Sequence, residues 1–449
     1  MNRLSPLLGL VFSSFVVALA QPGCAASDSS ESGSAPLANT NGNGQQGGGT
    51  TDFCKGGGAT IPLPGGDLCT GDLGKKLFRF ATCSCKSTNV AGVLTTDSFN
   101  SNTGADKRNG ASVGANEKLT DMGGFSIGGS VYVGKTGDAN GVGFQGAGAG
   151  KVAYDIWSGK DVSLSGVVQV GRDIHATGNV SALGIGSVGG TAHLSAGHSI
   201  NGFMGAKTVT ENVNIENPCD CEKKVDVPAI VSNFKSTNDN AVAHIDENTF
   251  AQRAGVQNMT LPCGKYYLSS VGGSGVTKIR AEGRVAMFVA GDFNVAGAFD
   301  IDLADNAEID LFIAGDFNVA GATQFGSLAK PSKVRVYVGG KNFRFAGAMA
   351  VGGNFYAPNA TIALASAFAM SGSIFGDNLQ MGGAFTIHYD EAILDTQGCK
   401  PPPPPGGCKT SDDCGGQACV NGTCGSCTVD EDCSSPLYCV EGKCVNIVH

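Results

Sequence analysis

The chain has 449 residues and a formal net charge of −9; it contains 69 glycines, and charged residues make up only 15% of it. Typical globular domains carry about 25% charged residues and roughly half as much glycine. The acidic balance and the scattered Lys and Arg argue against a nucleic-acid-binding surface, which requires a basic stripe. Hydrophobic residues at 41% exclude a wholly disordered chain, and no apolar run long enough to span a membrane follows the N-terminal segment.

Residues 1–23 have the features of an export signal. Arg3 supplies the positive start, and the apolar segment Leu7–Ala20 follows it. Two cleavage sites compete, because the tripeptide ending at Ala20 suits an ordinary signal peptidase, whereas Gln21–Cys24 (QPGC) resembles a bacterial lipobox. Glutamine occupies the lipobox position where an aliphatic residue is expected. Both sites predict export from the cytoplasm.

The cysteine count favours the lipobox. The chain has 17 cysteines, so lipidation of Cys24 leaves an even number that can pair completely in an oxidising compartment. Residues 24–52 are a polar Gly/Ser/Asn stretch that cannot bury a core and is suited to a disordered tether. We therefore expect an outer-membrane or cell-surface lipoprotein. The alternative is a secreted or periplasmic protein cleaved after Ala20, with one unpaired or intermolecular cysteine.

The main body is predicted to be all-β. After a cysteine-containing segment at residues 53–85, residues 86–398 are glycine-rich and strand-like, and residues 238–254 form the one stretch with helical character. The phrase AGDFNVAGA occurs at both 290–298 and 314–322. Between Phe293 and Val319 apolar residues fall mainly on odd positions and acidic or amide residues on even positions, with Phe312 as the main exception. This alternation is typical of strands that are buried on one side.

Weaker glycine-led copies of the phrase occur at 338–343, 351–355 and 375–385, and upstream at 127–133 and 170–174. A short phrase that recurs at this interval predicts a β-solenoid (β-helix-like) fold, in which equivalent residues of successive coils stack on one another. A β-sandwich is the competing fold, since it also uses short strands separated by glycine.

We interpret the candidate metal ligands and catalytic residues as structural residues. The carboxylates of Asp292, Asp300, Asp302, Asp310 and Asp316 would form one acidic face that could collect calcium, but the loop pattern of a calcium hand is missing. Solubility and protection of sheet edges are therefore the preferred explanations.

The histidines are interpreted in the same way. His175, His193 and His198 share one glycine-rich stretch, and a metal site would require two or three of them to converge with carboxylates. Surface or turn positions are the simpler explanation. His388 has no Gly-x-Ser-x-Gly partner, so closure of the last strand is preferred to catalysis. We predict no catalytic residues, no metal and no cofactor.

A proline-rich linker at 399–407 precedes a cysteine-dense tail at 408–449, which contains two similar four-cysteine units. Each unit is too small for a hydrophobic core, so disulfides are preferred to zinc, and the spacing leaves three pairings open per unit. The pairs Cys83/Cys85 and Cys219/Cys221 could bind metal or exchange thiols, but structural disulfides at the solenoid ends are the preferred interpretation. Cys399 is expected to fix the end of the last coil. The cysteines expected in disulfides, with partners unknown, are Cys54, Cys69, Cys83, Cys85, Cys219, Cys221, Cys263, Cys399, Cys408, Cys414, Cys419, Cys424, Cys427, Cys433, Cys439 and Cys444.

Residues 261–268 (LPCGKYYL), the two AGDFNVAGA copies, residues 355–360 (FYAPNA) and residues 387–394 (IHYDEAIL) resemble a domain of unknown function. That domain recurs in bacterial surface and pilus-associated (PilX-like) proteins, and the resemblance covers roughly residues 219–395. It implies an exported, β-rich repeat fold and supplies no catalytic residues. The cysteine spacing of the tail resembles small Dickkopf-type cysteine-rich modules.

These features together predict a non-enzymatic, exported cell-envelope protein with a structural or adhesive role. Its expected partners are the membrane, through the lipid anchor, and a surface protein or glycan. One alternative is a β-helix enzyme acting on polysaccharide, which would need paired carboxylates in an aromatic-lined groove. The other is a pilus-associated accessory protein, although the chain lacks the N-terminal helix of a pilin.

Overall fold

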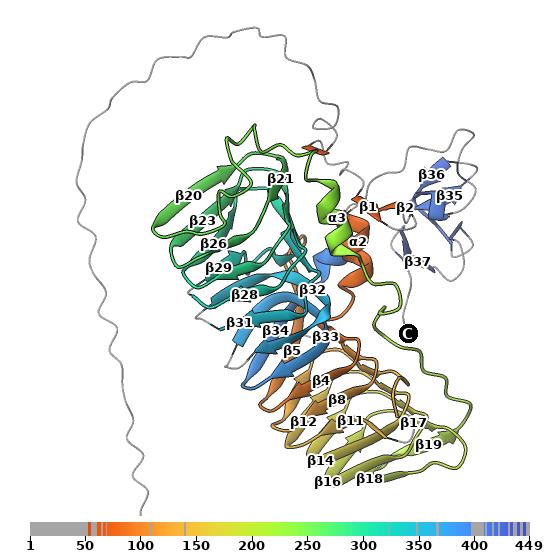
Figure 1. Cartoon of the computed structure of the whole chain (residues 1–449). Helices are drawn as coiled ribbons and strands as arrows, with labels where there is room; N and C mark the ends of the chain where they lie inside the picture. Colours follow the sequence, from red (N-terminus) through yellow and green to blue (C-terminus); the bar gives the residue numbers. More distant parts are fainter. Residues whose placement is uncertain are drawn as a thin grey trace, which may run out of the picture. The chain divides into compact units, whose positions relative to one another are not determined.

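The computed structural model describes residues 53–396, apart from 55–60, 64–65, 69, 108–109, 139–140, 322, 347–348 and 365–367, together with parts of 408–445. The signal segment, Cys24, the tether and the linker at 399–407 lie outside the described residues. Within them the fold is a β-solenoid of about 13 turns, as the repeat predicted (Figure 1). No described helix is both long and apolar enough to span a membrane.

Each coil of the carboxyl-terminal half, residues 256–390, has three sides. The first side contains β20 (Val256–Leu261), β23 (Val276–Ala281), β26 (Phe299–Leu303) and β29 (Thr323–Gly326). The second contains β21 (Gly264–Leu268), β24 (Arg284–Val289), β27 (Glu308–Ile313) and β30 (Val334–Val338). The third contains β22 (Val271–Gly273), β25 (Phe293–Val295), β28 (Phe317–Val319) and β31 (Asn342–Phe345). β32 (Met349–Leu364) and β33 (Phe368–Met381) each pass along all three sides, and β34 (Phe385–Asp390) returns to the first.

The amino-terminal half, residues 82–210, has the same three sides. The second side contains β3 (Thr82–Ser84), β7 (Val113–Ala115), β10 (Val131–Val133), β13 (Ile156–Ser158), β15 (Ile174–Ala176), β17 (Thr191–Leu194) and β19 (Lys207–Thr210). The third contains β4 (Ser87–Val90), β8 (Lys118–Asp121) and β11 (Val142–Gly146), and the first contains β5 (Leu94–Asn100), β9 (Phe125–Ile127) and β12 (Ala149–Val152). β14 (Asp161–Val170), β16 (Val180–Val188) and β18 (Ile200–Met204) run along the third and first sides together. A hairpin strand, β6 (Ala105–Lys107), pairs antiparallel with β5.

The two halves stack in reversed chain order. β33 and β34, at the end of the carboxyl-terminal half, pair in parallel with β3, β4 and β5, at the start of the amino-terminal half. One register partnership on this junction joins Leu94 to Phe385. Figure 1 shows the result, with β33 and β34 beside β4 and β5, β20 at one end of the stack and β16 and β18 at the other. Residues 211–255, the return segment, carry the chain back from β19 to β20. Nothing in the sequence had indicated this order.

The two copies of AGDFNVAGA stack directly, as predicted. Phe293 pairs in register with Phe317, and their rings stack with centroids 5.1 Å apart. Phe343 continues the row in the next coil. Phe355, which looked like a further copy of the same position, instead pairs with Val336 on the second side, so that alignment was wrong. The row continues through Ile362 and Leu379.

Phe312, the exception to the alternation, belongs to an outward-facing row that is nevertheless buried. Its ring stacks with Phe288 at 5.3 Å and Tyr337 at 4.6 Å. The return segment covers this row, since Phe234 stacks on Phe288 at 3.8 Å and α3 (Val227–Asn233) contacts β27. The second side is therefore apolar on both faces here, and this is why an outward position carries an aromatic residue.

The acidic positions do not form one solvated face. Asp292 and Asp316 occupy corners, where the Asp292 carboxylate accepts a hydrogen bond from the Asp316 backbone N–H of the next coil at 2.9 Å. Asp310 is fully buried beside Arg335, whose Nε and Nη2 donate to its carboxylate at 2.6 and 3.0 Å. The expectation of a single acidic face is wrong, because these carboxylates complete backbone or ion-pair contacts between coils.

The helices lie elsewhere than expected. Residues 238–254 form turns, in which the side chains of Asp239 and Asn240 accept hydrogen bonds from the backbone of Lys265 and Tyr267 on β21, at 2.8 and 2.9 Å. At this end of the solenoid the Asp239 and Asn240 side chains thus accept the backbone hydrogen bonds that a further strand would otherwise accept. Among the described residues, short helices lie instead at α2 (Thr70–Leu77) and α3, and 3₁₀ turns lie at Pro331–Lys333, Glu391–Asp395 and Ser411–Cys414.

Candidate functional site

The HYDEA motif, residues 388–392, fastens the two halves of the solenoid together. His388 Nδ1 lies 2.6 Å from Asp97 Oδ1 on β5. The Tyr389 hydroxyl donates to the backbone carbonyl of Phe78 at 2.7 Å, and the Ser98 hydroxyl donates to Glu391 at 2.9 Å. His388 and Glu391 therefore contact β5 of the amino-terminal half, and Tyr389 contacts the segment just before that half.

Asp390 is the fully buried centre of this junction. Its carboxylate accepts hydrogen bonds from the Ser101 N–H at 2.9 Å and the Ser101 hydroxyl at 2.6 Å, which come from the amino-terminal half. It also accepts the N–H of Ser332 at 3.2 Å and that of Ala392 at 3.1 Å. One carboxylate thus connects three segments, and a shortened or neutral side chain would leave several buried donors unsatisfied.

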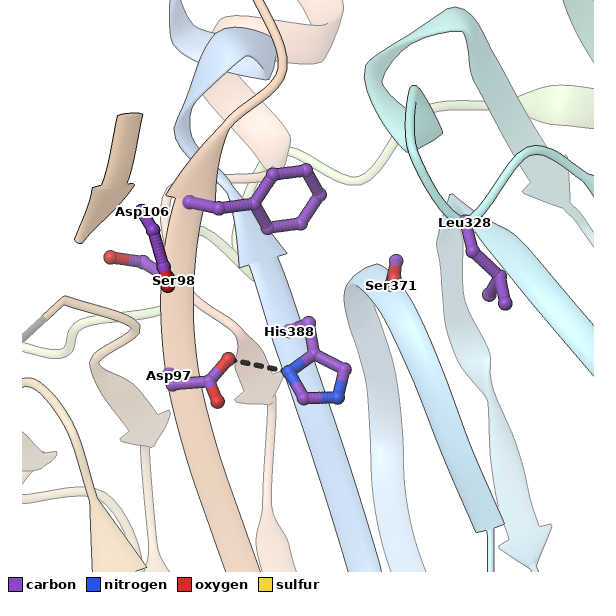
Figure 2. A pocket seen from close by; sticks show the side chains of 7 residues that line it. Asp97, Ser98, Asp106, Leu328, Ser371 and His388 are labelled. Atoms are coloured by element: carbon purple, nitrogen blue, oxygen red, sulfur yellow. Dashed lines mark hydrogen bonds and ion pairs between the residues drawn. The ribbon is translucent and has the colours of Figure 1, made fainter. Parts of the chain in front are cut away.

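A cavity of about 480 Å³ opens at the junction, and Asp97, Ser98, Asp106, Ser371 and His388 are among the residues that line it (Figure 2). Ser371 on β33, His388 on β34 and Asp97 on β5 are register partners across three adjacent strands. The imidazole, whose side chain is 44% exposed, is oriented by Asp97 and has a serine on its other side. No hydrogen bond joins Ser371 to His388 among the described contacts. The arrangement therefore places an oriented imidazole beside the Ser371 hydroxyl, without the hydrogen bond between them that would activate the hydroxyl as a nucleophile.

The YAPNA motif, residues 356–360, holds the return segment. The Tyr356 hydroxyl accepts a hydrogen bond from the Val225 N–H at 3.2 Å. Lys224 Nζ donates to the side-chain oxygen of Asn359 at 3.3 Å, and the Asn359 amide donates to the Gly339 carbonyl at 3.4 Å. Burial raises the pKa of Tyr356 well above its ordinary value of 10.0, so its hydroxyl stays neutral. Both motifs of the resemblance therefore connect segments that are distant in the sequence.

Two disulfides fix the return segment to the junction, and a third lies at the β20–β21 end of the solenoid. The two Cys-x-Cys pairs bond to one another, as Cys83–Cys219 and Cys85–Cys221, each across 136 residues. They lie at the junction and not at the solenoid ends, where they had been expected. In the chain-entropy model, closing a loop of this size stabilises the fold by roughly 4–5 kcal/mol. Cys54–Cys263 closes a still longer loop of 209 residues.

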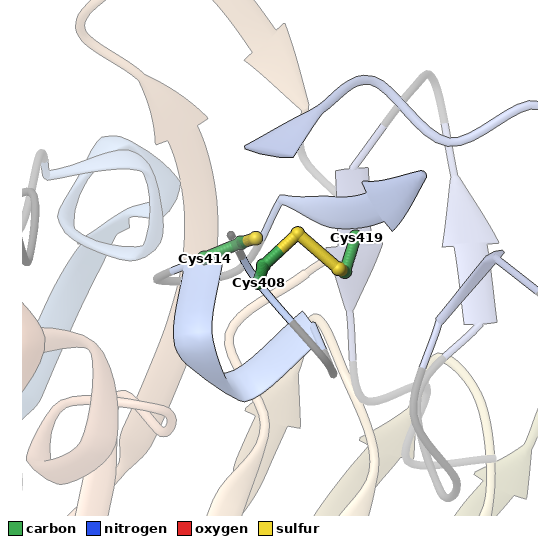
Figure 3. Close-up of side chains that lie close together, drawn as sticks. All are labelled: Cys408, Cys414 and Cys419. Atoms are coloured by element: carbon green, nitrogen blue, oxygen red, sulfur yellow. A yellow bond between two sulfur atoms is a disulfide. The ribbon is translucent and has the colours of Figure 1, made fainter. Parts of the chain in front are cut away.

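The four-cysteine units of the tail share one pairing, first with third and second with fourth. The bonds are Cys408–Cys419 and Cys414–Cys424 in the first unit, and Cys427–Cys439 and Cys433–Cys444 in the second. Figure 3 shows the first of these beside Cys414. Each unit contains a two-stranded hairpin, β35 (Ala418–Val420) with β36 (Thr423–Gly425), and β37 (Tyr438–Val440) with β38 (Lys443–Val445). The close sulfurs are consumed by disulfides, which excludes a zinc site built from these thiolates in the oxidised protein. Cys69 and Cys399 lie outside the described residues.

Two of the three clustered histidines come together. His175 on β15 and His193 on β17 are register partners, and their rings stack with centroids 4.5 Å apart. Trp157 stacks on the other face of His175 at 3.6 Å. Burial, with a smaller contribution from His193, lowers the pKa of His175. His198 lies in an exposed turn. The sequence had given no reason to separate this pair from the third histidine.

The fold and the cystines define a disulfide-linked β-solenoid protein. Residues 206–396 match the family model described as a domain of unknown function, DUF7305. The match covers the return segment and the carboxyl-terminal half of the solenoid, including YAPNA and HYDEA, and it leaves most of the amino-terminal half outside. No curated protein and no solved structure matches the chain.

Proposed function

We propose that this protein is an exported, non-enzymatic cell-envelope lipoprotein with a binding or structural role, anchored through Cys24 at the outer membrane or cell surface. The observation that carries the proposal is the set of seven disulfides among the described residues. Structural disulfides form and persist in oxidising compartments and are rare in the cytosol. Two of them join the return segment to the first coil of the amino-terminal half at the junction, so a reducing compartment would remove stabilisation there.

A binding role is supported by a patch of exposed aliphatic side chains at the amino-terminal half's free end. We define this distal patch as Val167, Leu183, Ile185 and Met204, which are 53%, 81%, 54% and 66% exposed. Val167 and Ile185 are register partners on β14 and β16, and Leu183 and Ile185 flank Gly184. Grouped exposed apolar residues mark interaction sites more often than single ones do. Aliphatic side chains without an exposed aromatic ring suit a protein ligand better than a glycan.

The test is a binding screen with the disulfide-bonded chain from residue 25 onward, with and without residues 408–449, against envelope proteins, host-surface proteins and glycans. A Leu183→Lys/Ile185→Lys variant should lose binding to a protein ligand. Val242→Lys is the matched control, because Val242 is 60% exposed but lies in the return segment. Binding that is unaffected by the first variant would contradict a role for the distal patch. Binding that needs only residues 408–449 would move the function to the tail.

A hydrolase is the second candidate, and the row of Ser371, His388 and Asp97 is the observation that favours it. A fluorophosphonate probe should then label the protein, and both Ser371→Ala and His388→Ala should abolish the label. Absence of labelling, together with no activity on esters or polysaccharides, would favour the non-enzymatic proposal. Pilus association is a third possibility that only the sequence resemblance supports.

A further inference from the structure

A group of metal-ligating side chains lies on the second side of the amino-terminal half, apart from the junction cavity. Asp173 precedes β15, His175 lies within it, and His193 lies one coil further on in β17. One ligand atom from each of these three residues can be chosen so that all lie within 4.8 Å of one another. The backbone register fixes the spacing of the two imidazoles, since His175 and His193 pair directly.

Glu211 places a second carboxylate beside His193. It follows β19, the next strand of the same side, and its Oε1 lies 3.0 Å from His193 Nδ1. The His193 and Glu211 side chains are 22% and 46% exposed. Both side chains are therefore partly open to solvent, and the Nδ1 atom of His193 is itself buried against Glu211.

The donor set matches the preferences of zinc and its neighbours. Imidazole nitrogen and carboxylate oxygen bind Zn²⁺ at about 2.0–2.2 Å, which places ligand atoms about 3.4 Å apart around a tetrahedral ion. The ligand atoms of Asp173, His175 and His193 already lie within 4.8 Å of one another, so side-chain rotation would have to close only the remaining distance. Asp173 Oδ1 already accepts the Thr191 N–H at 2.6 Å, which orients the carboxylate and leaves Oδ2 for an ion.

A stacking role alone does not account for this arrangement. Trp157, His175 and His193 form a continuous stack on three successive strands, and such a stack needs only flat rings. Here two carboxylates, from Asp173 and Glu211, lie beside the ring nitrogens of the last two members. We propose that His175, His193, Asp173 and Glu211 form a surface site for one divalent transition-metal ion of the Zn²⁺ type.

The experiment uses the disulfide-bonded chain from residue 25 onward, purified without a histidine tag. Isothermal titration with Zn²⁺, and visible absorption with Co²⁺ as a spectroscopic probe, measure stoichiometry, affinity and ligand field. The wild type should bind one ion per chain with micromolar or tighter affinity. His175→Phe/His193→Phe keeps flat rings in the stack but removes both nitrogens, and it should lose at least about tenfold in affinity, since even indirect perturbation of a metal site costs about 10–100-fold.

His198→Ala is the matched control, because it removes a nearby histidine outside the group, and it should leave binding unchanged. Thermal melts establish that each variant folds. The inference is overturned if the phenylalanine variant binds Zn²⁺ as the wild type does, if His198→Ala lowers affinity equally, or if the wild type binds no ion. Glu211→Gln supplies a further check, since it should weaken binding and alter the Co²⁺ spectrum while the ring stack persists.

Discussion

Replacing Arg335 by methionine tests the buried ion pair between adjacent coils. Arg335 is 1% exposed and Asp310 is fully buried. The guanidinium donates twice to Asp310, once to Glu308 at 2.9 Å and once to the Ser332 carbonyl at 3.1 Å. Methionine fills a similar volume but leaves the Asp310 carboxylate buried without its partner. Removing one member of a buried pair costs about 3–5 kcal/mol in unfolding free energy.

The double variant Arg335→Met/Asp310→Leu separates the pair from the packing around it. Removing both charges together should cost far less than the single change, because replacement of a whole buried pair by apolar residues is often close to neutral. Arg280→Met is the matched control, since Arg280 pairs with Asp302 on the surface, where the side chains are 49% and 56% exposed. Its loss should not exceed about 1 kcal/mol.

Urea denaturation followed by circular dichroism measures these differences, provided that the dependence of unfolding free energy on urea stays constant among variants. Equal losses for Arg335→Met and Arg280→Met would refute the assignment of a buried pair. If the loss in the double variant equalled the sum of the losses measured for Arg335→Met and Asp310→Leu singly, Arg335 and Asp310 would not interact.

Three further predictions concern packing, pH and oxidation. Phe317→Asp should unfold the carboxyl-terminal half, because the fully buried Phe317 ring stacks on Phe293 and Phe343. The control Asn318→Ser should change the unfolding free energy by no more than about 0.5 kcal/mol. Similar thermal melts for the two variants would contradict the orientation of β28. Burial raises the pKa of Asp121 from 3.8 to about 6. The stability that the protonated side chain contributes is therefore fully present below pH 3.8 and is lost as the pH rises through about 6. Asp121→Asn should therefore flatten the pH dependence of unfolding in that window, and an unchanged profile would refute the assignment. Residues 408–449 should contain no reactive thiol in the unreduced protein. After reduction this tail should become protease-sensitive while the solenoid persists. Stoichiometric zinc or reactive thiols in the unreduced tail would contradict the disulfide assignment.

The hydrogen bonds of Asp316 change the effect that its position in the sequence pattern suggests. The alternation predicts an outward-facing side chain, for which Asp316→Ser would be nearly neutral. Its carboxylate in fact accepts the N–H groups of Lys341 and Asn342 at 2.8 and 3.0 Å, and the Asn342 amide at 2.6 Å. The substitution should destabilise the corner, because a serine cannot satisfy these three donors together.

The solenoid could be predicted because its signal is local and repeated. Two identical phrases, alternating apolar residues and corner glycines fall within 33 residues between Ala290 and Ala322, and the structure stacks them in register. The amino-terminal half gave a weaker signal, since its coils differ in sequence. There the coil length is 18 residues between His175 and His193, and only weak glycine-led copies at 127–133 and 170–174 mark the repeat. The close approach of His175 and His193 therefore became visible only once the strand register was known.

The junction could not be predicted, because its partners lie far apart in the chain. Leu94 pairs with Phe385, and Cys83 bonds to Cys219. Parallel pairing between coils leaves no local pattern that identifies which coil is the neighbour, and cysteine spacing does not determine connectivity. The helix expected at 238–254 failed for a related reason, since Asp239 and Asn240 bond to β21 and thereby favour turns over helix.

The central proposal is that Cys24 anchors an exported protein, and mass spectrometry of the mature N-terminus tests it most directly. Buried acyl chains contribute about 0.8 kcal/mol per CH₂, so two or more chains give stable membrane anchoring. The proposal predicts an N-terminal peptide that begins at Cys24, carries a diacylglyceryl thioether and fractionates with outer membranes. A peptide that begins at Gln21 with an unmodified Cys24 would contradict the lipoprotein assignment and leave a secreted or periplasmic protein with an odd cysteine to be paired.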